Sequence, residues 1–372
     1  MAGQYPREKK DVVEKTYFAP RLHSFRRTME SSHLDGFLFT SLENIRYLCG
    51  FTGSDGALVL APEKSFFLTD SRYWTQSEEE VKGSEIVRYK KKIEGITSLL
   101  SDLRLKRIGF ESASLTLSTH RALLERLSDD ATLVPLEEEL KNLRAVKDAG
   151  ELDLLHRAID ISSNAFSQLV EILKEGVNER EAALEMEFSM KRNGANDLGF
   201  DIIIASGKRS ALPHGKAGDK RIQKGDFILI DFGSEFQGYH SDQTRTLICG
   251  QPSLEQKKVY EVVKDAQQGA IEKVRPGVPL LEIDAAAREY IRSQGYGDYF
   301  GHGLGHGIGL AVHEDPAVNY ENKGLTQEGM IFTVEPGVYI PDWGGVRIED
   351  MVRVTSQGAE LLTYLPRDLK VI

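Results

Sequence analysis

The sequence predicts a two-domain α/β (α+β) protein, in which an N-terminal α/β domain precedes a domain of antiparallel hairpins and helices. The chain has 372 residues, more than one ordinary hydrophobic core can organise. Strand-like and helical segments alternate as far as about residue 135. Beyond that point the pattern changes to long capped helices and two apolar hairpins.

The first domain is expected over residues 20–135, after a flexible polar N-terminus at 1–19. A helix is predicted over 21–29, because its apolar residues recur at a helical period. Further helical patterns, such as 114–127, lie between apolar runs that predict strands. The predicted strands are 36–40, 57–60, 65–69, 85–89, 107–110 and 132–136.

A glycine-rich segment, 47–56, lies within this first domain. It could cradle a ligand, but a tight loop between strands is the simpler interpretation. The chain contains no GxGxxG or Walker pattern, so no nucleotide site is indicated.

A charged connector at 136–150 leads into the second domain, expected over 151–372. Asp148 with Glu151 forms a capping box that opens a long helix. A similar cap opens the next helix at Asn178. The predicted helices are 151–174, 178–192, 253–274 and 280–293, and a strand is predicted over 200–205.

The first apolar hairpin pairs a strand at 227–232 with a return strand at 242–249. Asp231 lies inside the apolar run, where a bare carboxylate is costly unless it is paired or binds a metal. If the turn is centred between residues 236 and 237, Asp231 directly faces Asp242, with Cβ atoms roughly 4.5–5.5 Å apart. Like charges this close repel, and a divalent cation would relieve the repulsion. A solvated pair or a slipped register is the alternative.

Three histidines follow in a short glycine-rich segment, 299–316. They are His302, His306 and His313. Alternating glycines exclude a stable helix here but allow the backbone to approach a ligand closely. Each histidine could equally be a hydrogen-bonded core residue.

The second apolar hairpin pairs strands at 330–340 and 345–354 across a Pro-Asp-Trp-Gly-Gly turn. Symmetry about Asp342 places Glu335 opposite Glu349. A slip of one residue would destroy this pairing.

Together the two hairpins and the histidine segment indicate a metal centre. Four carboxylates and one histidine suit two divalent ions, because roughly −4 of ligand charge balances +4 of metal charge. This donor set favours Mn²⁺, Co²⁺, Fe²⁺ or Zn²⁺ over thiol-selected metals. Two ions ~3.5–4 Å apart suit hydrolysis through a bridging hydroxide and a polarised carbonyl.

At these residues the sequence resembles the pita-bread metallopeptidases, which include methionine aminopeptidase, Xaa-Pro aminopeptidase and Xaa-Pro dipeptidase (prolidase). The resemblance covers about 145–366. Residues 21–135 resemble the creatinase-type N-terminal domain of the proline-specific branch, through 47–56 and 69–73. Methionine aminopeptidases normally lack that domain, and creatinase lacks the metal ligands. The resemblance implies a C-terminal pita-bread domain with a curved antiparallel sheet and flanking helices.

The resemblance implies a role for each of the five ligands. Asp231 chelates one metal, while His306 and Glu335 hold the other. Asp242 and Glu349 bridge the two ions.

It also implies how substrate is handled. Glu335 is the proton shuttle between the attacking water and the leaving nitrogen. His214 corresponds to a substrate-binding histidine with a part in catalysis. His313 hydrogen-bonds the scissile carbonyl and stabilises the developing oxyanion, and His302 lines the pocket for the proline ring.

Arg347 is also a candidate substrate-binding residue, since strand alternation places it on the same face as Glu349. It could stabilise a bridging carboxylate or grip a substrate carboxylate. A purely structural ion pair is an equal alternative.

The implied function is hydrolysis of the Xaa-Pro bond at peptide N-termini, as in Xaa-Pro aminopeptidase, with Xaa-Pro dipeptidase as the alternative. The Xaa-Pro bond lacks an N–H and carries a rigid ring, so a dedicated pocket is needed to select it. Manganese is the expected metal, and a homodimer or larger assembly is expected. A non-peptide hydrolase or lyase, and a non-catalytic binding protein, are the further alternatives.

The composition limits the partners. Net charge is −10, from 57 acidic and 47 basic residues, which argues against nucleic acid or an anionic membrane. The two cysteines, Cys49 and Cys249, make no disulfide framework or thiolate cluster. No secretory signal is visible, and no apolar run approaches the ~20 residues of a membrane span. We therefore expect a cytoplasmic protein.

Overall fold

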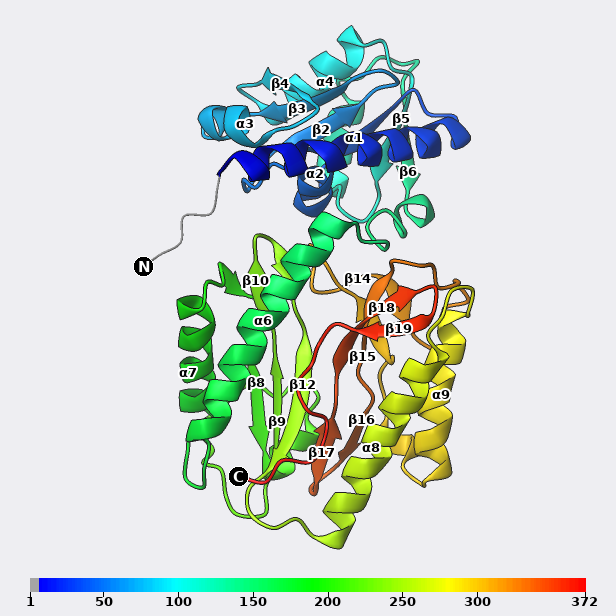
Figure 1. Cartoon of the computed structure of the whole chain (residues 1–372). Helices are drawn as coiled ribbons and strands as arrows, with labels where there is room; N and C mark the ends of the chain where they lie inside the picture. The colour runs from blue at the N-terminus through cyan, green and yellow to red at the C-terminus, as the bar shows by residue number, and fades with distance from the viewer. Residues whose placement is uncertain (1–6) are drawn as a thin grey trace. The chain divides into compact units, whose positions relative to one another are not determined.

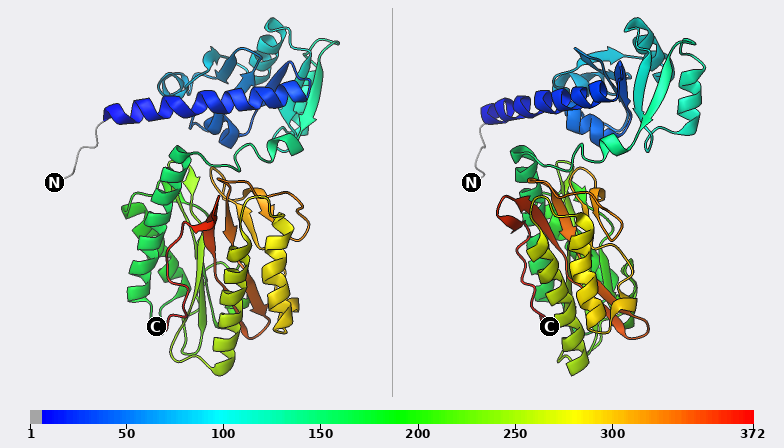
Figure 2. Two further views of the ribbon diagram at one scale, coloured as in Figure 1. Left: turned by 45° about the vertical axis from the view of Figure 1, so that its right-hand side comes forward. Right: turned by 90° about the vertical axis from the view of Figure 1, so that its right-hand side faces the viewer.

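The structure is a computed structural model that describes the backbone from residue 7 and the side chains from residue 17 to the C-terminus. The chain forms two compact units, the first ending at Leu143 and the second running from Arg144 to Ile372 (Figures 1 and 2). This boundary falls inside the connector predicted at 136–150. No helix in the described part of the chain is long and apolar enough to cross a membrane.

The first unit is built on a mixed sheet with strand order β4-β3-β2-β1-β5-β6. Strands β1 to β3 pair antiparallel, whereas β4, β5 and β6 join the sheet in parallel. All the strands predicted for this domain are present. They are β1 (Gly36–Phe39), β2 (Ala57–Leu60), β3 (Ser65–Thr69), β4 (Glu85–Arg88), β5 (Arg107–Glu111) and β6 (Thr132–Leu136).

Helix α1 (Arg7–Ser31) lies across one face of this sheet (Figure 1). Phe25 packs edge-on against Phe37 and Phe39 of β1, with ring centroids 4.8 Å apart in each case. The flexible N-terminus expected over 1–19 is therefore helical from Arg7, and residues 1–6 lie outside the described residues. The other helices are α2 (Leu42–Cys49), α3 (Trp74–Glu80), α4 (Lys92–Asp102) and α5 (Leu117–Leu124).

The second unit contains two helix pairs that flank its central strands in Figure 1. The pairs are α6 (Ala149–Ile172) with α7 (Glu179–Arg192), and α8 (Leu254–Lys273) with α9 (Leu280–Ser293). Asp148 and Glu151 make both bonds of the predicted capping box, and the Asn178 side chain caps α7. These local signals set the helix starts within about two residues of prediction.

The strands of the second unit pair antiparallel throughout the described ladders. One sheet has the order β12-β9-β8, another β14-β13-β15-β18-β19 and a third β11-β10-β7, and β16 pairs with β17. An isolated bridge between Thr244 and Glu349 joins the first hairpin to the second. The strands are β7 (Asp197–Leu198), β8 (Ile203–Ser206), β9 (Phe227–Phe232), β10 (Ser234–Phe236), β11 (Tyr239–His240), β12 (Gln243–Ile248), β13 (Gly305–Gly307), β14 (Glu314–Val318), β15 (Ile331–Val334), β16 (Gly337–Ile340), β17 (Gly344–Arg347), β18 (Asp350–Thr355) and β19 (Gly358–Leu361).

The register of the first hairpin differs from the prediction. Asp231 of β9 pairs with Thr244 of β12, not with Asp242. The turn is centred between Gln237 and Gly238, which both have positive φ (47° and 76°), as a two-residue type I′ turn requires. The slip moves the partner of Asp231 by two residues. Because side chains alternate with a period of two, Asp242 stays on the same face as a diagonal neighbour.

The register of the second hairpin is as predicted. In the ladder nearer the turn, Gly337 pairs with Arg347. In the ladder farther from the turn, Val334 pairs with Asp350, so Glu335 and Glu349 lie between the two ladders. Both ladders have the symmetry about Asp342 that the sequence indicates, with φ 59° at that residue. Glu335 and Glu349 therefore lie at matched positions, in the interruption between the two ladders.

Candidate metal centre

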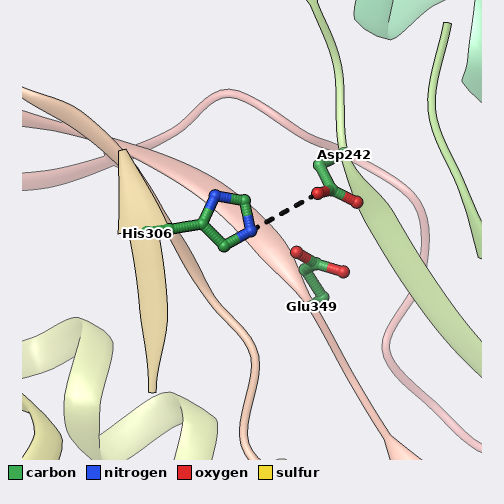
Figure 3. Close-up of side chains that lie close together, drawn as sticks. All are labelled: Asp242, His306 and Glu349. Atoms are coloured by element: carbon green, nitrogen blue, oxygen red, sulfur yellow. Dashed lines mark ion pairs between the residues drawn. The ribbon is translucent and has the colours of Figure 1, made fainter. Parts of the chain in front are cut away.

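Three of the five predicted metal ligands converge from different strands. Asp242 directly precedes β12, His306 lies in β13, and Glu349 lies between β17 and β18. One ligand atom from each lies within 4.8 Å of the others, and Figure 3 shows the His306 ring pointing toward both carboxylates. His306 Nε2 is 3.6 Å from Asp242 Oδ2 and 3.4 Å from Glu335 Oε1. Glu335 therefore belongs to the same cluster.

Asp231, the remaining predicted ligand, is tied to the cluster through Arg347, whose Nη2 donates to its Oδ2 at 2.6 Å. Its other oxygen, Oδ1, is buried without a hydrogen-bond partner among the described residues. The same is true of Asp242 Oδ1. Buried carboxylate oxygens are normally paired, so both atoms have room for a ligand that is neither backbone nor side chain.

Burial and mutual repulsion make the carboxylates hard to ionise together. Burial, with the nearby charges of Glu349 and Asp231, raises the pKa of Asp242. Burial likewise raises the pKa of Glu335 to about 8, and burial with Glu335 raises that of Glu349. Cations between these groups would favour the charged forms.

His306 is oriented as a metal ligand. Its Nδ1 lies 3.1 Å from the Gly307 carbonyl oxygen, which can only accept, so Nδ1 carries the proton and Nε2 presents its lone pair to the carboxylates. Burial, helped by His313, lowers the pKa of His306 to about 4, so the ring is neutral near pH 7. A Cβ on Gly305 would overlap the Thr333 carbonyl, which explains the glycine before this histidine.

The donor set therefore fits divalent cations. It offers carboxylate oxygens and one neutral imidazole, two of the oxygens have no other partner, and the described residues bring no cysteine to the cluster. Oxygen-rich sets of this kind suit hard or borderline divalent metals. The residues that would hold the metal are Asp231, Asp242, His306, Glu335 and Glu349.

Arg347 connects the metal ligands to one another. Its Nε donates to Thr244 Oγ1 at 3.1 Å, and that hydroxyl donates to Glu349 Oε2 at 2.7 Å. With its bond to Asp231, the guanidinium thus positions one ligand directly and a second through Thr244. Sequence reasoning missed Thr244, although it lies two residues after Asp242 and hence on the same strand face.

The same arginine reaches the histidines predicted to bind substrate. Its Nη1 donates to Tyr339 Oη at 2.8 Å and to the carbonyl of Pro213, next to His214, at 3.2 Å. Tyr339 Oη lies 3.0 Å from His302 Nε2. Tyr339 was also missed, because a tyrosine in an apolar strand is indistinguishable from a core residue in sequence.

His302 is fixed on both sides. Its Nδ1 donates to the Gly303 carbonyl at 2.7 Å, so Nε2 accepts the proton of Tyr339 Oη. Burial lowers its pKa to about 4, which keeps the ring neutral. A neutral, immobilised ring suits the wall of a pocket for an uncharged ring such as proline.

His313 and His214 lie on the exposed side of the cluster. The rings of His313 and His306 are 4.2 Å apart between centroids. Burial lowers the pKa of His313; the charge of Asp231 opposes this shift, and the neighbouring His214 adds to it. Both side chains are exposed and accessible to a ligand.

The loop that carries His214 is anchored by a buried carboxylate. Glu179 accepts from Ser206 N at 2.7 Å, from Arg209 Nε at 3.1 Å and from Gly218 N at 3.1 Å. These contacts hold both ends of the loop, and the short 3₁₀ helix Gly207–Ala211 lies between them. The loop is thus fixed although its tip is exposed.

Comparison with known proteins agrees with this geometry. Residues 153–356 match metallopeptidase family M24, and residues 21–146 match the creatinase/prolidase N-terminal domain. The chain belongs to metallopeptidase family M24. This M24 chain therefore has the predicted creatinase-type N-terminal domain and C-terminal pita-bread domain, and the predicted family resemblance is confirmed.

Its relatives span nearly the whole chain. An Xaa-Pro dipeptidase from Pyrococcus horikoshii is 38% identical over 344 residues, covering 92% of this chain and 96% of that protein. The structure of an Xaa-Pro dipeptidase from Bacillus anthracis has a TM-score of 0.92 at 39% identity, covering 95% of this chain and 99% of the other. An X-Pro aminopeptidase from Thermotoga maritima has a TM-score of 0.86 at 39% identity, covering 94% and 99%.

Proposed function

We propose that this M24 metallopeptidase hydrolyses the Xaa-Pro bond at the N-terminus of peptides, as an Xaa-Pro aminopeptidase. The observation that carries the proposal is the hydrogen-bond chain from Asp231 through Arg347 and Tyr339 to His302. It ties a metal ligand to a neutral, partly buried ring that suits a proline pocket. Relatives described as Xaa-Pro dipeptidase and X-Pro aminopeptidase support the substrate class.

The predicted ligands Asp231, Asp242, His306, Glu335 and Glu349 would hold two divalent ions, with manganese as the proposed metal. When bound, the ions would supply an activated water and a Lewis acid for the scissile carbonyl. Glu335 would take the proton of that water and deliver it to the leaving proline nitrogen.

The histidines would handle the peptide. His313, exposed beside His306, would donate to the carbonyl oxygen as negative charge develops there. His214 would contact the bound peptide from the loop that Glu179 anchors. His302 would form the wall against the proline ring.

Arg347 bears on the choice between aminopeptidase and dipeptidase. Four of its five N–H groups are occupied, by Thr244, Pro213, Tyr339 and Asp231. A bidentate grip on the carboxylate of an Xaa-Pro dipeptide needs two free N–H groups. Arg347 is therefore a brace for the metal ligands, without the free N–H groups for that grip. This favours the aminopeptidase.

The dipeptidase is the second candidate, because a relative described as an Xaa-Pro dipeptidase is structurally so similar. A paired hydrolysis assay with Mn²⁺-loaded protein separates the two. Cleavage of an Xaa-Pro-Yaa tripeptide with little cleavage of Gly-Pro supports the aminopeptidase. Cleavage of Gly-Pro alone supports the dipeptidase. Cleavage of neither, with metal present, would overturn the proposal in favour of a non-peptide substrate or a binding role.

Homodimeric assembly and a cytoplasmic location stay predictions. Sedimentation velocity of the metal-loaded protein would test the first, and cell fractionation the second. Metal analysis of protein purified without added metal would test the choice of manganese.

A further inference from the structure

A buried ion triad lies directly beside the two histidines. Glu314 accepts from Lys147 Nζ at 2.7 Å and from Arg144 at 3.0 Å (Nε) and 2.8 Å (Nη2). The side chains of Lys147 and Glu314 are 1% and 5% exposed, and that of Arg144 is 15% exposed. No metal-ligand or substrate role involves these three residues.

Glu314 lies at the point where the two histidine-bearing segments pair. Glu314 begins β14, directly after His313, and pairs across the hairpin with Gly307 of β13, directly after His306. The carboxylate is thus anchored where the strands carrying the two histidines meet. The ring centroids of these histidines are 4.2 Å apart.

The triad also supports the loop between the two strands. Ala311 N donates to Glu314 Oε2 at 3.4 Å. A Cβ on Gly309 would overlap the Glu314 carboxylate, so this loop packs directly on the triad. The Gly309 carbonyl in turn accepts from His240 N at 2.9 Å, two residues before Asp242. The triad thus supports the loop between the histidines, and that loop in turn bonds to the segment leading to Asp242.

Stability is a poor explanation for the triad. The two cations and the carboxylate lie together with little access to water. Replacing buried ion groups with apolar residues of similar volume is often neutral or stabilising. The hydrogen bonds of an ion triad are instead strongly directional, which suits the fixing of a geometry.

We propose that Glu314, held by Lys147 and Arg144, is a positioning residue that fixes the β13–β14 hairpin and thereby the orientation of the His313 and His306 rings. Lys147 and Arg144 lie where the chain enters the second unit. This segment therefore takes part in organising the site as well as connecting the units. The catalytic consequence rests on the proposed function, because it requires that His313 contact the substrate.

Lys147→Met is the sharpest variant. Methionine is close to lysine in length, and the Arg144–Glu314 ion pair is left in place. We expect kcat and kcat/KM for an Xaa-Pro-Yaa peptide to fall together by about 10–100-fold, as for other residues that orient catalytic groups. Met186→Ala in α7 is the control, since it removes a fully buried core side chain that does not touch the hairpin. It should lower stability without this loss of turnover.

The second readout does not depend on activity. In ¹³C-histidine-labelled, metal-free protein, Lys147→Met should shift or broaden the Cε1–Hε1 signals of His306 and His313 and leave those of His120 and His156 in place. Met186→Ala should move none of the four. Unmoved His306 and His313 signals, or unchanged kcat in folded Lys147→Met protein, would overturn the proposal.

A second pair of variants applies if Lys147→Met does not fold. Arg144→Lys keeps the positive charge and should retain most of the turnover and the wild-type histidine signals, whereas Arg144→Met should lose both. Equal turnover and equal histidine signals in the Arg144→Lys and Arg144→Met proteins would contradict the proposal. If the wild-type protein cleaves no Xaa-Pro peptide, the proposed function fails, and the histidine signals still decide the positioning role.

Discussion

At the scale of single residues, the surroundings of the site disfavour the charged forms of its carboxylates and histidines. Three buried or partly buried carboxylates lie close together with raised pKa values, and two partly buried histidines are neutral rings. Arg347 supplies a permanent positive charge, but only one among four acidic ligands. Divalent cations would balance the remaining negative charge of the ligands.

Replacing Glu335 separates its two proposed roles. Glu335→Gln keeps an oxygen ligand but cannot accept a proton, so the variant should bind metal more weakly and lose nearly all turnover. Metal content by mass spectrometry and peptide hydrolysis measure the two effects. Full activity in the metal-loaded variant would remove Glu335 from the proton-transfer role.

Asp242→Asn and Glu349→Gln test the bridging ligands. Each change removes a charge that we expect both ions to share, so each should lower the number of ions bound per chain. Isothermal titration with Mn²⁺ gives this stoichiometry directly. Thr244→Val offers a matched comparison, because it leaves the ligand and removes only the hydroxyl that orients Glu349. Unchanged stoichiometry in both ligand variants would contradict the assignment.

At the scale of elements, the site depends on how the two hairpins are joined. Arg245 of β12 donates to Asp350 Oδ1 at 2.7 Å and to the Glu349 carbonyl at 2.6 Å, and both charged side chains are 2% exposed. The pair lies on the opposite strand face from Thr244 and Glu349. It holds β12 against the start of β18, and so fixes the backbone of a metal ligand.

Arg245→Met should therefore be strongly destabilising. It leaves the Asp350 carboxylate buried without its cation, which typically lowers the free energy of unfolding by about 3–5 kcal/mol. Urea unfolding followed by circular dichroism measures the loss. The double variant Arg245→Met/Asp350→Asn lacks the unpaired charge and should recover part of the lost stability. If Arg245→Met alone is as stable as the wild type, the Arg245–Asp350 pair does not hold the two strands together.

At the scale of the whole molecule, metal binding, stability and pH should be linked. Burial raises the pKa of Glu335 from its ordinary 4.5 to about 8, and raises those of Asp242 and Glu349 as well. A carboxyl with a raised pKa stabilises the folded, metal-free protein below pH 4.5, and that contribution is lost as the pH rises toward 8. Metal binding has the opposite dependence, because ligands must lose their protons.

The stabilisation by metal should accordingly increase with pH. The difference in Tm with and without Mn²⁺ should be small near about pH 5 and large near about pH 8, because each displaced proton changes the apparent metal affinity by about tenfold per pH unit. Differential scanning calorimetry at several pH values measures the difference. Glu335→Gln should flatten the dependence, since the glutamine does not titrate. A difference that is constant over this range would contradict the assigned pKa shifts.

The sequence by itself determined the helices and strands of this protein and the types of residue that could bind a metal. Capping residues such as Asp148 and Asn178 act within one helical turn, and apolar periodicity acts within one strand, so both are readable locally. The second hairpin register was also readable, because its turn is short and symmetric about Asp342. The five ligand types and their order were enough to indicate the family.

Only the tertiary structure decided the register of the first hairpin and the contacts that organise the site. The turn at Gln237 and Gly238 differs from the predicted centre by one position, a choice set by backbone conformation and by pairing with distant strands. Tyr339, Arg347 and Glu314 acquire their roles from partners far away in the chain. Such contacts leave no local periodicity, because hydrogen bonds between separate strands depend on which elements pack together.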